Sequence, residues 1–202
     1  MAHDSQIRNI HFEANQDAIN GCFTQLFSKG VEIRVSLPCK LEELLCDQVG
    51  IASDYLETRI QTVFLDGQPV DDVKQAFVGN GAAIALSAAM PGLVGAVLRK
   101  GGYFAGLRDS ITFQCDTENQ EACWGVVTVK LFNMTTREVG PLLLKHGILL
   151  SGNEFHDIIK DWVGVFRREC QVILLDDREV GLDELLAATE SVETFILQVG
   201  DA

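Results

Sequence analysis

The stretch Val63-Phe-Leu-Asp-Gly-Gln-Pro-Val70 has a counterpart later in the chain, Ile173-Leu-Leu-Asp-Asp-Arg-Glu-Val180. In both stretches an apolar run leads into a turn signal, which is Asp66-Gly67 in the first and Asp176-Asp177 in the second. This pattern is typical of a strand that ends in a tight turn. The two stretches therefore predict the same strand-and-turn unit at two places.

The residues around the two stretches also agree in order and spacing. Before each stretch lie an alternating apolar segment, a Leu-Leu pair and a Gly-Ile pair, and after it lies an apolar strand. The matched residues are Val31–Val35 with Val127–Leu131, Leu44-Leu45 with Leu142-Leu143, Gly50-Ile51 with Gly147-Ile148, and Ile84–Leu86 with Phe195–Leu197. The second copy is longer by one helix, which carries Trp162. Apolar strands resemble one another, so loose matches are common, but the shared order predicts an internal duplication.

The predicted elements indicate an α+β fold of two related small mixed-sheet subdomains, each with helices on one face. The predicted organisation is an N-terminal helical segment (1–30), a first repeat (31–92), a Gly-rich linker with a hairpin strand (93–125) and a second repeat (126–202). Residues 110–115 are expected to pair with a strand at 124–132. Ser151 and Glu154 predict a capping box at the start of a helix.

The first repeat resembles the β-grasp sulfur carriers, the ubiquitin-like small proteins that serve thiamine and molybdopterin synthesis. The resemblance rests on Phe64-Leu-Asp-Gly-Gln-Pro-Val70 followed, after a gap, by Ala83-Ile-Ala-Leu-Ser87. Those carriers end in an activated Gly-Gly, whereas this sequence ends in Val199-Gly-Asp-Ala202. The internal pair Gly101-Gly102 would need proteolysis to expose its carboxylate. The resemblance therefore implies a β-grasp-like fold and protein docking, but not sulfur-carrier chemistry.

Composition limits the classes of partner. The 202 residues include 29 acidic and 16 basic ones, which gives a net charge of -13. Such a field repels nucleic acids and anionic membrane surfaces, so neither is expected as a partner. The N-terminus lacks an apolar signal core, and a cytoplasmic location is predicted. The six cysteines lack the spacing of a metal site, so free thiols, no metal and no cofactor are expected, with a Cys115–Cys123 bridge as the exception.

One stretch departs from the acidic average. From Val73 to Arg108 there is no Asp or Glu, and glycines are frequent. Three interpretations remain open: an anion pocket formed by backbone N–H groups and basic side chains, a tightly packed connector, or an interface with a partner. The candidate ligand-binding residues are Gly92, Gly95, Arg99, Lys100, Gly101, Gly102 and Arg108.

No residue set predicts catalysis. Ser151 lies near His146 and His156 in sequence, but it lacks a nucleophile elbow and is better explained as a helix cap. We therefore expect a non-catalytic binding or assembly protein that uses residues 89–108 to bind a protein partner or a second copy. The alternative is a phosphate- or carboxylate-binding protein or enzyme that uses the same stretch. Changing Arg99 and Lys100 to Glu is expected to weaken association or anion binding and to leave the thermal midpoint nearly unchanged, because exposed charges contribute little to folding.

Overall fold

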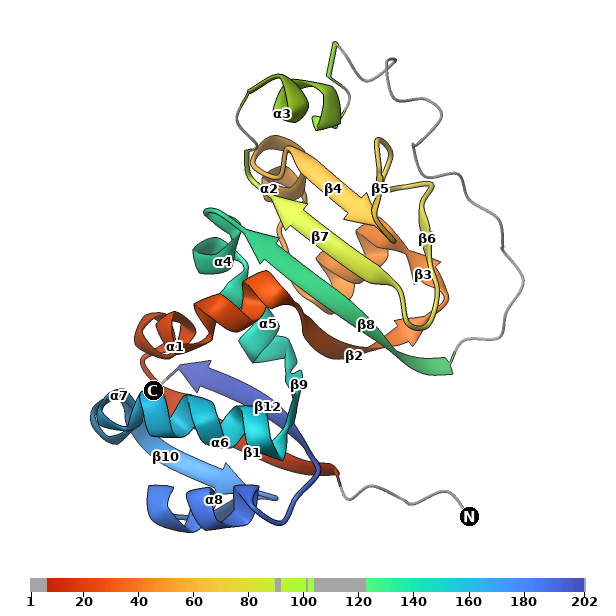
Figure 1. Cartoon of the computed structure of the whole chain (residues 1–202). Coiled ribbons are helices and arrows are strands. Elements are labelled where there is room, and N and C mark those ends of the chain that lie inside the picture. The colour runs from red at the N-terminus through yellow and green to blue at the C-terminus, as the bar shows by residue number, and fades with distance from the viewer. Residues whose placement is uncertain (1–6, 90–91, 101, 104–122, 202) are drawn as a thin grey trace.

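The computed structural model describes residues 7–89, 92–100, 102–103 and 123–201. Its centre is one mixed sheet in the order β11-β10-β1-β12-β9-β2-β8-β7-β4-β5 (Figure 1). The strands are β1 (Ile7–Ala14), β2 (Val31–Leu37), β4 (Thr62–Leu65), β5 (Gln68–Pro69), β7 (Ala83–Ser87), β8 (Cys123–Phe132), β9 (Ile148–Ser151), β10 (Cys170–Leu175), β11 (Arg178–Glu179) and β12 (Thr194–Asp201). A separate small sheet pairs β3 (Cys39–Lys40) with β6 (Phe77–Val78). The fold class is α+β, as predicted.

Helices connect the strands and begin where the sequence provides caps. They are α1 (Gln16–Lys29), the π-helix η1 (Glu43–Gln48), α2 (Ser53–Thr58), α3 (Gly92–Leu98), α4 (Thr135–Glu138), α5 (Gly140–His146), α6 (Gly152–Asp161), α7 (Val163–Glu169) and α8 (Leu182–Thr189). The Asn15 side chain accepts a hydrogen bond from Ala18 N at the start of α1. The capping box predicted for Ser151 and Glu154 is confirmed at the start of α6. No helix in the described residues is long and apolar enough to cross a membrane.

The sheet has two halves that meet at one pair of strands, β2 and β9. They are antiparallel, with Glu32 opposite Leu149. We call β2, β8, β7, β4 and β5 the upper half, and β9, β12, β1, β10 and β11 the lower half. From the junction outward, strand pairs in each half are antiparallel, parallel, antiparallel and antiparallel. The halves therefore share one pairing pattern.

Two strands cross between the halves. β1 lies in the lower half between β10 and β12, although the next strand along the chain, β2, belongs to the upper half. β8 lies in the upper half between β2 and β7, although it is followed by β9. The crossing helices α1 and α5 pack on each other in the middle of the molecule (Figure 1). Neither half is therefore built from one continuous segment.

Some described elements differ from the sequence expectations. The segment 1–30, predicted to be helical, contains strand β1 before α1. The short strand β9 was not predicted either. The hairpin strand predicted at 110–115 lies outside the described residues, and the described neighbours of β8 are β2 and β7.

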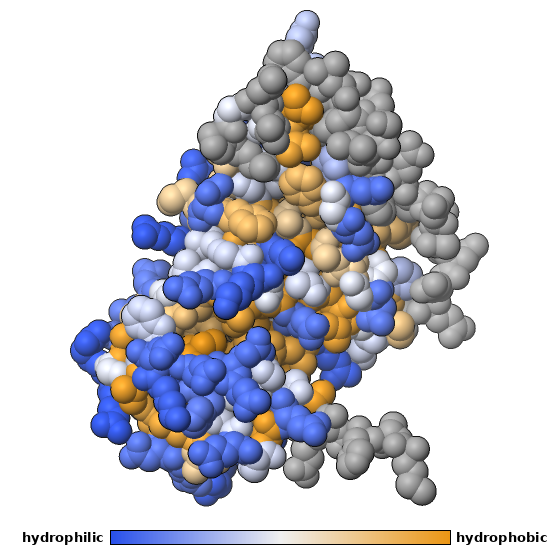
Figure 2. Space-filling model, in the orientation of Figure 1, coloured by the Kyte–Doolittle hydropathy of each residue, from blue (hydrophilic) through white to orange (hydrophobic). Residues whose placement is uncertain are grey.

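Strand periodicity separates a buried face of the sheet from an exposed one. In β2, Val31, Ile33 and Val35 are buried, whereas Glu32 and Arg34 are exposed. On the buried face, one apolar core runs through both halves. Its largest fully buried side chains include Phe12, Phe23, Phe27, Phe155, Phe166 and Phe195. Figure 2 shows hydrophilic side chains gathered over the lower helices, with more apolar groups over the middle of the molecule.

Candidate functional site

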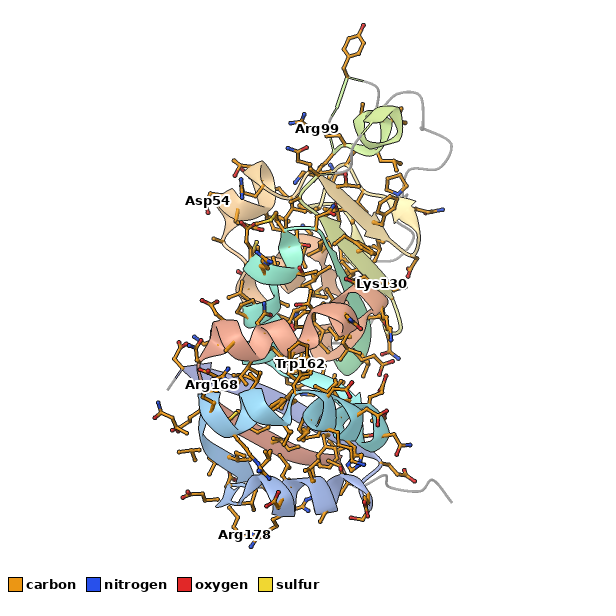
Figure 3. All side chains as sticks on the ribbon, turned by 60° about the vertical axis from the view of Figure 1, so that its left-hand side comes forward. Asp54, Arg99, Lys130, Trp162, Arg168 and Arg178 are labelled. Carbon is orange, nitrogen blue, oxygen red and sulfur yellow. The ribbon has the colours of Figure 1, made fainter. Side chains whose placement is uncertain are left out.

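The predicted glycine-rich stretch is partly described; it contains α3 and lies beside α2. Gly92, with φ of 78°, begins α3, and Gly95 is buried within it. Arg99 follows the helix, and Figure 3 shows it at the upper end of the molecule. Gly102 donates its backbone N–H to Arg99 O at 3.1 Å. Gly101 and Arg108 lie outside the described residues, so the seven candidates are only partly placed.

Lys100 has a structural role. Its backbone N–H donates to Gln61 O at 2.7 Å, and its Nζ donates to Leu56 O at 2.9 Å. Burial lowers the pKa of this lysine. Because Leu56 belongs to α2, the Nζ bond ties the stretch to that helix, and the backbone bond ties it to the segment just before β4. The expectation that Lys100 is an exposed charge is wrong, and its replacement by Glu would disturb the fold.

Tyr103 is the most exposed large side chain among the described residues of this stretch. It exposes 96% of its surface and lies three residues after the anchored Lys100. Aromatic side chains supply much of the contact area in protein interfaces, with a hydroxyl group that can remain hydrated. The exposure of Tyr103 therefore favours the interface interpretation of this stretch.

A second candidate site lies on the exposed face of the sheet, where the two halves meet. It is a hollow of about 380 Å³, which we call the Arg34 hollow. Its lining residues come from β1, β12, β9, β2, β8 and the end of α5. They are Asn9, Arg34, Trp124, His146, Gly147, Leu149, Ile196 and Gln198. None of them was proposed from the sequence as a ligand-binding residue.

Arg34 and Trp124 form the most distinctive pair in this hollow. The guanidinium carbon of Arg34 lies 5.5 Å from the centroid of the Trp124 ring, within the range of a cation–π interaction. Trp124 is 67% exposed. Arg34 forms no ion pair with a described residue, whereas Arg8, Arg59, Arg167, Arg168 and Arg178 each pair with a carboxylate. The guanidinium thus lies against a ring rather than against an acid.

His146 fixes the backbone beneath this pair. One ring nitrogen lies 2.9 Å from Gln48 O and the other lies 3.0 Å from Arg34 O. The carbonyl of His146 in turn accepts a hydrogen bond from Gln198 Nε2 at 3.2 Å. The sequence explains His146 by its place at the end of a helix, which the structure confirms. The bond to Arg34 O was not predictable, because it joins residues 112 positions apart.

An acidic hollow lies on the other side of Leu149. This Glu32 hollow has a volume of about 350 Å³. It is lined by Leu26, Gly30, Val31, Glu32, Thr128, Leu149, Leu150, Ser151, Glu154 and Thr194. Ser151 and Glu154 are already bonded to each other at the capping box. The junction of the sheet halves therefore has a basic and an acidic side, with Leu149 between them.

Other reactive side chains of the described residues have structural partners. Tyr55 donates a short hydrogen bond to Glu138, which also pairs with Arg59 at 3.0 Å, so this cluster joins α2 to α4. His156 lies 2.7 Å from Thr189 Oγ1. No group of three potential metal ligands occurs in the described part of the chain. Of the cysteines, 22, 39, 46, 123 and 170 are free thiols, and Cys115 lies outside the described residues.

Comparison with protein-family models, with curated protein sequences and with solved structures gives no match.

Proposed function

We propose that the protein is a non-catalytic binding or assembly protein, with its binding surface on residues 89–108. The observation that supports this most directly is the 96% exposure of Tyr103 within a stretch that has no acidic residue. In a chain of net charge -13, a surface without carboxylates lets a second copy or another acidic protein approach with less repulsion. The partner is thus a protein, and a second copy is the simplest one. A cytoplasmic location belongs to the same proposal.

The alternative function is binding of a phosphate or carboxylate by the same stretch. It has less support, because the Lys100 amino group is bonded to Leu56 O and is partly buried. Of the two basic side chains that the structure describes in this stretch, Arg99 is exposed and Lys100 is partly buried. An anion site there would therefore depend on Arg99 and on neighbouring backbone N–H groups.

Sedimentation velocity over a concentration series tests the proposal. The wild type should associate as its concentration rises, and Arg99→Glu or Tyr103→Ser should weaken that association. Arg178→Glu is the matched control, since it reverses an exposed arginine at the opposite end of the molecule (Figure 3). Lys100 stays unchanged, so that loss of binding is not confused with loss of fold.

Two results would decide against this function. A wild type that stays monomeric at every concentration would contradict assembly through a second copy. A melting temperature that phosphate raises in the wild type, but not in Arg99→Glu, would favour the alternative function.

A further inference from the structure

We infer that the Arg34 hollow binds a small monocarboxylic acid whose carboxylate is attached to a flat, largely apolar group. This site is separate from residues 89–108 and does not depend on the function proposed for them.

The carboxylate requirement comes from Arg34. The guanidinium carbon of Arg34 lies 5.5 Å from the centroid of the Trp124 ring, and a cation–π contact of this kind uses none of the N–H groups around the edge of the guanidinium as hydrogen-bond donors. A carboxylate matches that edge with two parallel hydrogen bonds. Arg34 forms no ion pair with any described residue, so no carboxylate in the described part of the chain uses these donors.

Arg34 is also held in place before a ligand arrives. Its carbonyl is bonded to the ring of His146, and its side chain lies against Trp124. The residue opposite Arg34 on β8 is Val126, and Trp124 lies one exposed-face position further along that strand. A side chain that is already ordered loses less conformational entropy on binding than a mobile one. His146 and Trp124 therefore act as positioning residues for Arg34.

The flat apolar part of the ligand follows from the rest of the hollow. Leu149 and Ile196 provide an aliphatic floor, and they lie on neighbouring strands directly opposite each other. Trp124 adds an exposed indole, on which a planar group can stack. The volume of about 380 Å³ lies near the lower end of the range for small-molecule pockets, roughly 300–1,000 Å³. A single ring with one substituent suits this space.

Charge limits the ligand to one carboxylate. Among the described residues, the lining of the Arg34 hollow contains no Asp or Glu, whereas Glu32 and Glu154 line the hollow beyond Leu149. A second carboxylate that extended across Leu149 would meet those acids and be repelled. The same acids repel a phosphate more strongly, because its negative charge is higher. A phosphate also has no flat apolar group that could stack on the indole of Trp124.

The two tryptophans of the chain provide the test. In a ¹H–¹⁵N spectrum the indole signal of Trp124 can be assigned with Trp162→Phe, and benzoate serves as the probe. Benzoate should shift the Trp124 signal in a saturable way and leave the Trp162 signal unchanged. Benzamide, which has the same shape without the charge, should bind at least about tenfold more weakly than benzoate, because hydrogen bonds to a charged group are the stronger ones. Inorganic phosphate should leave the signal in place.

Variants of Arg34 separate a built site from surface adsorption. Arg34→Gln should abolish the benzoate shift, and Arg34→Lys should restore it only in part, because lysine lacks the planar fork. Arg178→Gln, at another exposed arginine, should bind as the wild type does. Unchanged circular dichroism would show that these variants fold. Equal binding of benzamide and benzoate, no effect of Arg34→Gln, or no saturable shift at all would each overturn the inference.

Discussion

The two halves of the sheet are built alike but are filled by different strands. In each half a glycine with positive φ ends the crossing helix before the junction strand: Gly30 (φ 122°) precedes β2, and Gly147 (φ 111°) precedes β9. In each half an aspartate with positive φ begins the outer turn, Asp66 (φ 51°) above and Asp176 (φ 48°) below. The central strand, however, is β7 in the upper half and β1 in the lower half.

The outer turns show how one framework accepts either strand. The Asp66 carboxylate accepts a hydrogen bond from Ala83 N, in β7, at 2.8 Å. The Asp176 carboxylate accepts one from Asn9 N, in β1, also at 2.8 Å. Both bonds are made to backbone, so they do not depend on the sequence of the central strand. We propose that the halves arose by duplication. By position in the sheet, β2 corresponds to β9, whereas the sequence match pairs β2 with β8.

Removing β1 should have the largest effect. A chain that begins at residue 15 would lack the strand that pairs with β10 on one side and with β12 on the other, together with the buried side chains of Ile10 and Phe12. A buried Phe alone contributes about 3–5 kcal/mol, and whole domains are stable by only about 5–15 kcal/mol. The lower half should unfold, which hydrogen exchange at β10 and β12 would detect. A chain that begins at residue 7 is the control, and retained protection without β1 would contradict the assigned role.

Gly140→Ala should have the next largest effect, because it acts where α1 and α5 meet. A Cβ atom on Gly140 would overlap Asn20 Oδ1 and would lie 2.8 Å from the ring of Phe27, both from α1. Overpacking of this kind costs about 1–3 kcal/mol. Gly164→Ala in α7 is the matched control, because its Cβ would meet no atom within 4 Å. Urea unfolding should show a loss of stability for the first variant and a gain of up to about 1 kcal/mol for the second.

Asp176→Asn and Asp66→Asn should each lower the stability of the fold by less than Gly140→Ala does, and by different amounts in the two turns. Burial alone would raise the pKa of Asp176, but hydrogen bonds from Asn9 and Arg8, and the charge of Arg8, lower it overall. A lowered pKa stabilises the fold above the ordinary value of 3.8, and this stabilisation is lost as the pH falls through the folded-state pKa. The Asp176 pair is partly exposed, so Asp176→Asn should cost only about 1 kcal/mol at neutral pH.

Asp66→Asn should cost less, since no arginine pairs with Asp66 among the described residues. Urea unfolding at neutral and acidic pH would measure both variants, and the cost of Asp176→Asn should shrink in acid. A cost that is constant with pH would contradict the role of the charge.

The smallest effect is expected for thiol labelling of the native protein, in which Cys39 and Cys170 should react slowly. The same labelling in urea shows whether the two halves unfold together. Burial raises the pKa of Cys39 to about 11 and that of Cys170 to about 12, so both should react slowly, whereas the exposed Cys123 should react quickly. Cys39 reports on residues beside the upper half and Cys170 on the lower half. One core runs through both halves, so both thiols should become reactive at the same urea concentration. Separate midpoints would show two independent units.

Local patterns predicted much of the fold but not its pairing. The helix at 182–189 and the alternating strands near 31–35 and 124–132 lie where periodicity indicates. β1 was missed because its apolar residues continue into the apolar side of α1, and β9 has only four residues. Pairing could not be predicted, because Arg8 and Asp176 are 168 positions apart.

The Arg34 hollow was missed for the same reason. Its residues come from five strands and the end of a helix, and each one alone looks like an ordinary exposed or partly buried position. The approach of Arg34 to Trp124 follows from the register of β2 on β8, with Arg34 opposite Val126. A register set by the turn and by long-range packing cannot be read from either strand alone.

The position of β1 has a consequence for synthesis on the ribosome. β1 precedes every strand of the upper half in the chain, whereas both of its partners, β10 and β12, follow all of them. Until residues 170–201 emerge, Ile10 and Phe12 have no strand to cover them. Contacts over such sequence distances slow folding, and uncovered strand edges favour association between nascent chains. The lower half can therefore close only after residues 170–201 have been made, and until then β1 is the strand most open to association with other nascent chains.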